Sequence, residues 1–143
     1  MRLYLDTNVF IYLSNRKYPY YVSCRELIAS CRSKSIPLVT SAETFQEIIH
    51  WSKNKNRLKN GIEIVKRFKK IVWELFPVDE TIVDLYLEKA SRYKQVPSRD
   101  LIHLATCIEN KIKHIVTLDK DFNFFKEVVS LAPHEALEFI SAK

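Results

Sequence analysis

Short apolar runs that alternate with helical patterns are the feature that most constrains how this chain can fold. The runs span six residues or fewer and lie at residues 3–5, 36–40, 71–76 and 114–117, with a candidate fifth run at 128–131. Between them, apolar residues recur every three or four positions, which is typical of helices with one buried face. Strands that are apolar and separated by helices indicate a parallel sheet covered on both faces. The sequence therefore predicts an α/β fold with a central short parallel sheet.

The size and composition of the chain are those of a globular protein with its own core. Its 143 residues fit one domain, residues 1–143, which is large enough to bury a core without disulfides. A hydrophobic content of 47% with 28% charged residues excludes a disordered chain. The apolar runs are too short to cross a bilayer, and Asp6 interrupts the N-terminus too early for a signal peptide. We therefore expect a cytoplasmic protein with no membrane partner.

The positions of the three cysteines are also consistent with a cytoplasmic protein. Cys24 and Cys31 lie seven positions apart in a helical pattern, which separates their backbones by about 10 Å. That distance exceeds the roughly 7 Å limit for a disulfide. Cys107 lies on an apolar helix face, and none of the spacings is typical of zinc. We expect three buried free thiols in a reducing compartment.

Four acidic residues stand just after predicted strands or near the starts of helical patterns: Asp6, Glu47, Asp100 and Asp119. In open parallel sheets, ligands bind outside the carboxyl ends of the strands, so these side chains are expected to share one cleft. Clustered carboxylates repel each other unless a hard cation lies among them. Mg²⁺ and Mn²⁺ suit oxygen-rich sites, and they commonly act on phosphate esters. The acids therefore make a metal-dependent nuclease the leading hypothesis.

Several of these residues also have a plainer role. A lone Asp at a strand end usually caps the next helix, but Thr7 or Asn8 can do so here and leave Asp6 free for a metal. Asn8 can alternatively orient Asp6. Asp100 lies in a first helical turn, where the helix dipole favours an acid in any case. Thr117 either hydrogen-bonds a ligand carboxylate or merely ends its strand. The metal hypothesis thus depends on the acids as a group.

Two histidines follow acids at a spacing found in di-iron helix bundles, His50 after Glu47 and His103 after Asp100. Those bundles need four long facing helices, whereas Asp6 follows a strand. We therefore expect His103 to be a supporting or core residue, and His50 to lie on the surface.

The net charge of +6 comes from one segment. Residues 53–70 hold eight basic residues and one acid, a local balance of +7, which leaves −1 for the rest of the chain. A solvated helix face is the plain interpretation. Beside an acidic metal cleft, a surface that attracts a polyanion is the better explanation. We expect Lys66, Lys69 and Lys70 to contact RNA, on a helix whose buried face includes Ile62.

Four segments together resemble the PIN domain, the family of metal-dependent ribonucleases that includes the VapC toxins of prokaryotic toxin–antitoxin pairs. They are Leu5–Val9, Ser41–Glu47, Asp100–Thr106 and Thr117–Phe122. Each match is weak by itself, but the four occur in family order and span nearly the whole chain.

The resemblance implies a three-layer α/β/α sandwich, in which Asp6, Glu47, Asp100 and Asp119 hold one or two Mg²⁺ or Mn²⁺ ions. It implies endonucleolytic hydrolysis of RNA by an activated water, leaving a 3′-hydroxyl and a 5′-phosphate. It also implies a homodimer and, for a toxin, an antitoxin protein as partner. Other functions stay open at this point: a housekeeping RNA-processing nuclease, a nucleic-acid-binding module without cleavage, or a phosphoacceptor signalling domain. The last usually needs a second acid beside Asp6, which is absent.

Two of the acids have close competitors. Glu43 lies one helical turn before Glu47, and the match of Thr-Phe-Gln-Glu to the family selects Glu47. Asp121 lies two residues after Asp119, and the spacing from Thr117 favours Asp119, with Asp121 as a helper or a turn residue.

Overall fold

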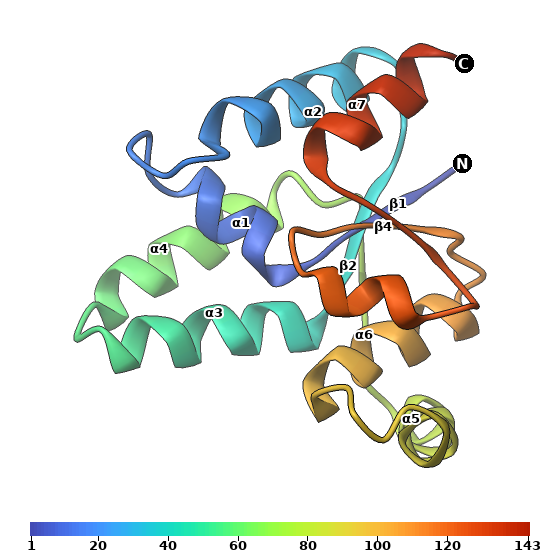
Figure 1. The fold of residues 1–143 in the computed structure, drawn as a ribbon. Coiled ribbons are helices and arrows are strands. Elements are labelled where there is room, and N and C mark those ends of the chain that lie inside the picture. The colour runs from blue at the N-terminus through green and yellow to red at the C-terminus, as the bar shows by residue number, and fades with distance from the viewer.

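The computed structural model describes residues Met1–Lys143, built around a five-stranded parallel sheet (Figure 1). The strands are β1 (Leu3–Leu5), β2 (Leu38–Ser41), β3 (Glu74–Phe76), β4 (His114–Val116) and β5 (Val129–Leu131). Their order is β3-β2-β1-β4-β5, and every neighbouring pair is parallel. The first strand of the chain is therefore the centre of the sheet, and the residue that follows it leaves from the middle of one edge.

Seven α-helices and one short 3-10 helix surround the sheet. They are α1 (Thr7–Leu13), α2 (Tyr21–Ser33), α3 (Ala42–Asn54), α4 (Leu58–Lys69), α5 (Glu80–Arg92), α6 (Ser98–Glu109), η1 (Lys120–Phe124) and α7 (Pro133–Ser141). Helices α1 to α4 and α7 pack on one face, whereas α5 and α6 pack on the other (Figure 1). This arrangement confirms the predicted three-layer α/β/α sandwich. No helix is both long enough and apolar enough to span a membrane.

The central strand shows why its run is apolar at every position. Leu3 and Leu5 belong to the core under α1–α4 and α7, whereas Tyr4 belongs to the core under α5 and α6. Successive strand residues point to opposite faces, so a strand covered on both sides needs apolar residues on both. The side chain of Tyr4 is fully buried, yet it carries a hydroxyl toward the carboxyl edge of the sheet.

Two expectations, one for the basic segment 53–70 and one for the strand after it, are wrong. The predicted strand at 71–76 begins only at Glu74, which is exposed, because β3 is an edge strand with one neighbour. Ile62 is 40% exposed, whereas Ile64 and Phe68 are buried. The contact of α4 with α3 sets which face of this helix is inside.

The only glycine of the chain, Gly61, lies where α4 crosses α3. A Cβ at this position would lie 2.0 Å from Ser52 Oγ and 2.4 Å from Ser52 Cβ. Ser52 is fully buried, and its hydroxyl donates a hydrogen bond to the backbone oxygen of Ile48 (2.8 Å). The φ of Gly61 is not positive, so its backbone conformation does not require a glycine. The glycine is needed because α3 and α4 pack too closely there for a side chain.

The cysteines are free and buried, as expected: Cys24, Cys31 and Cys107. Burial raises the pKa of Cys24 to about 12 and that of Cys31 to about 11. At neutral pH these thiols stay protonated and behave as small hydrophobic side chains.

Candidate metal centre

The four acids selected from the sequence meet at the carboxyl edge of the sheet. Asp6 follows β1, and Asp119 follows β4 after two residues, while Glu47 lies in the second turn of α3 and Asp100 in the first turn of α6. All four line one cavity of about 250 Å³, whose other walls include Asn8 and helix α1. Because β1, β2 and β4 are parallel neighbours, the segments that follow them emerge on the same side.

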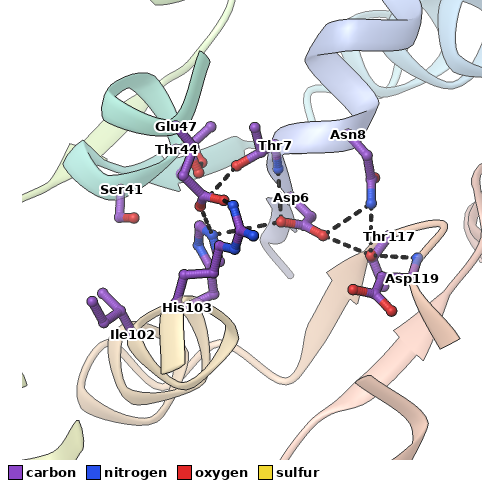
Figure 2. Close-up of polar contacts among 12 residues, drawn as sticks. Asp6, Thr7, Asn8, Ser41, Thr44, Glu47, Ile102, His103, Thr117 and Asp119 are labelled. Carbon is purple, nitrogen blue, oxygen red and sulfur yellow. Dashed lines mark hydrogen bonds and ion pairs between the residues drawn. The ribbon is translucent and has the colours of Figure 1, made fainter. Parts of the chain in front are cut away.

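Asp6 is held by hydrogen bonds on both carboxylate oxygens (Figure 2). Its Oδ1 accepts from the backbone N–H of Thr7 (2.7 Å), and its Oδ2 accepts from Thr117 Oγ1 (2.7 Å) and Asn8 Nδ2 (3.1 Å). Asp6 is itself the N-cap of α1, so the expectation that Thr7 or Asn8 would cap this helix is wrong. The Asp6 carboxylate therefore caps α1 and also lines the cavity.

Thr117 joins two of the acids. Besides donating to Asp6, its hydroxyl accepts a hydrogen bond from the backbone N–H of Asp119 (3.0 Å). Asn8 also connects Asp6 to the loop after β4, because its amide nitrogen donates to Asp6 and its amide oxygen accepts from the backbone N–H of Leu118 (3.3 Å). Strand β4 ends at Val116, so Thr117 is the residue that links Asp6 to the loop carrying Asp119.

A buried histidine holds Glu47, and the sequence indicated only a supporting role for it. Nε2 of His103 donates to Glu47 Oε1 (2.5 Å) and lies 3.6 Å from Asp6 Oδ1 (Figure 2). Its Nδ1 lies 2.5 Å from the hydroxyl of Tyr4, which lies 2.8 Å from Ser41 Oγ. The chain of contacts from the centre of β1 to Glu47 therefore fixes the imidazole in one orientation. His50, by contrast, is exposed, as expected.

Tyr4 and His103 form the part of the site that sequence reasoning did not assemble. Tyr4 is the middle residue of β1, and His103 lies one helical turn after Asp100 on the inward face of α6. Burial alone would lower the pKa of His103, but the hydrogen bond to Glu47 and the charges of Asp6 and Glu47 raise it above 6.5. The raised pKa favours the protonated imidazole, whose positive charge opposes the negative charge of the carboxylates.

Three carboxylates form a tighter group within the site. One oxygen each of Asp100, Asp119 and Asp121 lies within 4.8 Å of the other two. Oδ2 of Asp100 is buried and has no hydrogen-bond partner. Burial, together with the charges of Asp6 and Asp119, raises the pKa of Asp100 to about 7. An unpartnered buried oxygen among carboxylates suits a hard, oxygen-binding cation, so the donor set fits Mg²⁺ or Mn²⁺.

The structure separates Glu43 from Glu47 but keeps Asp121 beside Asp119. Glu43 is half-buried but does not line the cavity, whereas Glu47 does. Asp121 lies closer to the other acids than the sequence indicated, because Asp119 Oδ1 accepts from its backbone N–H (2.9 Å) and thereby turns η1 toward the site. Arg99, which no sequence motif singled out, lines the mouth of the cavity with its guanidinium 4.0 Å from Glu47 Oε2.

The profile of the PIN domain family matches residues 3–128, a span that includes all four acids. The chain belongs to the PIN domain family. Its relatives in this family include the VapC ribonuclease Mb1869c of Mycobacterium bovis and ribonuclease VapC13 of Mycobacterium tuberculosis. Each is 28% identical over 131 residues, which cover 90% of this chain and 98% of the relative. Ribonuclease VapC23 of M. tuberculosis is 29% identical over 117 residues, covering 82% of this chain and 92% of the relative.

Solved PIN domain structures share the fold. The structure of VapBC2 from Rickettsia felis bound to a promoter DNA fragment aligns with a TM-score of 0.76 at 17% identity, covering 92% of this chain and 98% of that one. VapC20 of M. tuberculosis, a toxin that cleaves the sarcin-ricin loop, aligns with a TM-score of 0.72 at 18% identity, covering 88% and 98%. The parallel sheet and its helical layers are therefore those of PIN domains.

Proposed function

We propose that this chain is a divalent-metal-dependent endoribonuclease that hydrolyses RNA phosphodiester bonds, and that it is the toxin of a toxin–antitoxin pair. The observation that carries the proposal is the convergence of Asp6, Glu47, Asp100 and Asp119 in one cavity of a PIN domain. The relatives over most of the chain are VapC ribonucleases, which supports cleavage of RNA in particular.

Asp6, Glu47, Asp100 and Asp119 are the residues that would hold Mg²⁺ or Mn²⁺, with Asp121 as an additional oxygen donor. The unpartnered Oδ2 of Asp100 and its raised pKa support a cation at this point, because a nearby positive charge would stabilise the ionised carboxylate. A bound ion of this kind lowers the pKa of a water and neutralises negative charge on the phosphodiester.

The surrounding residues keep the carboxylates in position. Thr117 and Asn8 restrain Asp6, and His103 restrains Glu47, so neither acid has to reorganise when a substrate enters. Partners of metal ligands commonly change metal affinity or activity by about 10- to 100-fold when they are removed. Tyr4 acts one contact further away, by fixing the ring of His103.

A polyanionic substrate needs positive charge near this acidic cavity. Arg99 supplies a guanidinium at the mouth, and its side chain is 61% exposed. Lys66, Lys69 and Lys70 are exposed near the end of α4, and we assign them contacts with the RNA backbone. Contacts with the phosphate backbone position an RNA strand without recognising its bases.

The proposed partners are an antitoxin and a second copy of the chain. Several solved structures with this fold are VapBC toxin–antitoxin complexes, among them those from Rickettsia felis and Haemophilus influenzae. For the homodimer, α5 offers the exposed apolar side chains of Val83 and Leu87, one helical turn apart. Exposed apolar side chains that share one helix face are suited to an interface between subunits.

The test is cleavage of RNA by the purified protein with Mg²⁺, with Mn²⁺ or with excess EDTA. Cleavage should require the metal and should leave a 3′-hydroxyl and a 5′-phosphate. Asp6→Asn should keep the circular dichroism spectrum but lower cleavage by more than about 100-fold, because an amide is a weaker, uncharged ligand. Asp84→Asn, an exposed acid on α5, is the matched control and should cleave normally.

Two results would contradict the proposal. Cleavage that persists in excess EDTA would exclude a metal-dependent reaction. Binding of RNA without cleavage at any metal concentration would instead favour a nucleic-acid-binding module with this fold.

A further inference from the structure

A second cavity, of about 350 Å³, lies between the end of α1 and the pair formed by α3 and α4. Its walls include two aromatic and two basic side chains: Tyr18, Trp51, Arg57 and Arg67. The volume falls within the roughly 300–1,000 Å³ typical of small-molecule sites. None of these side chains takes part in the acid cluster, so the cavity needs an explanation of its own.

Two helices lead from the acid cluster to this cavity. On α3, Glu47 lines the first cavity and Trp51 lines the second, four residues later on the same helix face. At the end of α1, Ile11 lines the first cavity, and Ser14, the residue that follows the helix, lines the second. Ser14 Oγ donates to the backbone oxygen of Ile11 (2.6 Å). The spacing of four residues between Glu47 and Trp51 corresponds to about 6 Å along α3. An RNA strand that crosses the acid cluster can therefore reach the second cavity within a few nucleotides.

The basic side chains of the cavity are available to a ligand. Arg57 and Arg67 are exposed, and the acid in the same wall, Glu63, pairs with Lys66 at 3.9 Å and not with either arginine. Guanidinium groups bind phosphate through paired hydrogen bonds, and they also stack on planar groups. The cavity therefore offers two phosphate-binding groups that no carboxylate neutralises.

The aromatic side chains are held in place from behind. Trp51 is half-buried and packs against the core of the face that carries α1–α4. Tyr18 is also half-buried, and its ring stands edge-on to that of Tyr12 at 85°, with centroids 5.9 Å apart. Unpaired RNA bases are commonly recognised by stacking on aromatic rings of this kind.

We propose that this cavity is a nucleotide subsite for single-stranded RNA, with a base against Trp51 or Tyr18 and its phosphate on Arg57 and Arg67. The proposal rests on the proposed function, because the nucleotide belongs to the same strand that crosses the acid cluster. Asn60 and Glu63, in the same wall, supply an amide and a carboxylate for the edge of the base. A carboxylate accepts hydrogen bonds from amino groups such as N4 of cytosine, so the subsite favours a base with a donor edge.

The lining favours RNA over an apolar protein segment. Six of the nine lining residues are polar or charged. An amphipathic helix buries its apolar face against an apolar groove, which this cavity does not provide. An acidic peptide is the other ligand that two arginines could bind, and the experiments below distinguish it from RNA.

The chain contains two tryptophans, which allows a direct test. Trp73 is 67% exposed, so Trp73→Phe leaves Trp51 as the only tryptophan at little structural cost. This protein is titrated in EDTA with a short single-stranded RNA of mixed sequence and with each nucleoside 5′-monophosphate. We expect saturable quenching of Trp51 fluorescence, strongest with the nucleotides whose bases carry an amino group.

Substitutions in the single-tryptophan protein then identify the contacts. Arg57→Ala and Arg67→Ala should each weaken RNA binding roughly tenfold, and Tyr18→Ala should do so by a similar factor. Arg92→Ala is the matched control: Arg92 is 61% exposed on α5, and its removal should leave binding unchanged. Arg57 is exposed and its side chain does not cap α4, so its replacement should not affect folding.

The outcomes distinguish this inference from the proposed function. Unchanged quenching and affinity in Arg57→Ala and Arg67→Ala, with normal metal-dependent cleavage, would overturn the subsite and leave the nuclease intact. Variants that keep RNA affinity but lose affinity for an antitoxin would overturn it in favour of a protein partner. If the unmodified chain neither binds nor cleaves RNA with Mg²⁺ or Mn²⁺, both proposals fail.

Discussion

Asp100 is 7% exposed at the start of α6, with one carboxylate oxygen buried and unpartnered. Burial and the charges of Asp6 and Asp119 raise its pKa from 3.8 to about 7. Because this pKa is higher in the folded chain than in the unfolded one, ionisation of Asp100 opposes folding. The cost is absent below the unfolded value of 3.8, grows as the pH rises, and is complete above about 7.

Asp100→Asn should therefore stabilise the metal-free protein at about pH 8, where an amide avoids the cost of a buried charge. Thermal unfolding in EDTA should show a higher Tm for the variant, and the difference should disappear as the pH is lowered toward about 4. With Mg²⁺ present the unmodified chain should gain stability, whereas the variant should gain less. A variant that is less stable than the parent in EDTA at high pH would show that Asp100 is stabilised by contacts instead.

The sequence predicted the members of the site better than their contacts. Position relative to strand ends and helix starts indicated Asp6 and Asp100, whereas the family resemblance was needed to choose Glu47 over Glu43. The spacing from Thr117 favoured Asp119, and all four acids line one cavity. The roles of Tyr4 and His103 depend on where β1 and α6 lie relative to each other, which no local pattern contains. Their contact joins residues 99 positions apart in the chain.

At the scale of elements, the packing of α3 against α4 depends on Gly61. Replacing a helical glycine by alanine usually stabilises a helix by about 0.5–1 kcal/mol. Here the added methyl group would lie 2.0 Å from Ser52 Oγ, and overpacking of this kind costs about 1–3 kcal/mol. Gly61→Ala should therefore destabilise the protein by about 1–2 kcal/mol in urea unfolding.

Second-site variants test this explanation of Gly61. Ser52→Gly combined with Gly61→Ala should recover most of the lost stability, because it removes both atoms that clash. Ser52→Ala should not, since its Cβ would remain 2.4 Å away. Lys59→Ala, an exposed position of the same helix, is the control and should change stability little. A Gly61→Ala protein as stable as the parent would mean that α3 and α4 can move apart freely.

The elements themselves were largely predictable, because apolar spacing reports which residues face a core. The basic helix was the exception. Its apolar residues Ile62, Ile64 and Val65 fit more than one face, and only the crossing with α3 places Ile64 inside. The length of the edge strand β3 was overestimated for a similar reason, because an apolar run does not show which strand lacks a second neighbour.

For the whole molecule, the distribution of charge determines how a polyanion approaches. The segment 53–70 has a balance of +7, while the rest of the chain has −1 and holds the acid cluster. Helix α4 packs against α3, the helix that carries Glu47, so the basic segment lies beside an element that contributes one of the four acids (Figure 1). In the proposed function, RNA attracted to the segment is brought close to the cavity.

Reversal of Lys66, Lys69 and Lys70 to Glu tests this steering, because it takes the formal net charge from +6 to zero. All three side chains are exposed, and the Lys66–Glu63 pair at 3.9 Å is too exposed to matter for stability. For each lysine–phosphate pair that the reversal removes, the logarithmic slope of RNA affinity against salt should fall by about 0.7, so we expect a reduction of up to about 2. Metal affinity, measured by the rise of Tm with Mn²⁺, should stay nearly constant.

Lys94, Lys113 and Lys126, all exposed, provide the matched control, because their reversal changes the net charge equally and lies outside the basic segment. If net charge alone attracted RNA, both triple variants would bind RNA more weakly to the same extent. If the segment steers RNA toward the acids, only the first should bind more weakly, and the difference should be largest at low ionic strength, where screening is weakest. Equal weakening in the two variants, or none in the first, would show that segment 53–70 serves another partner.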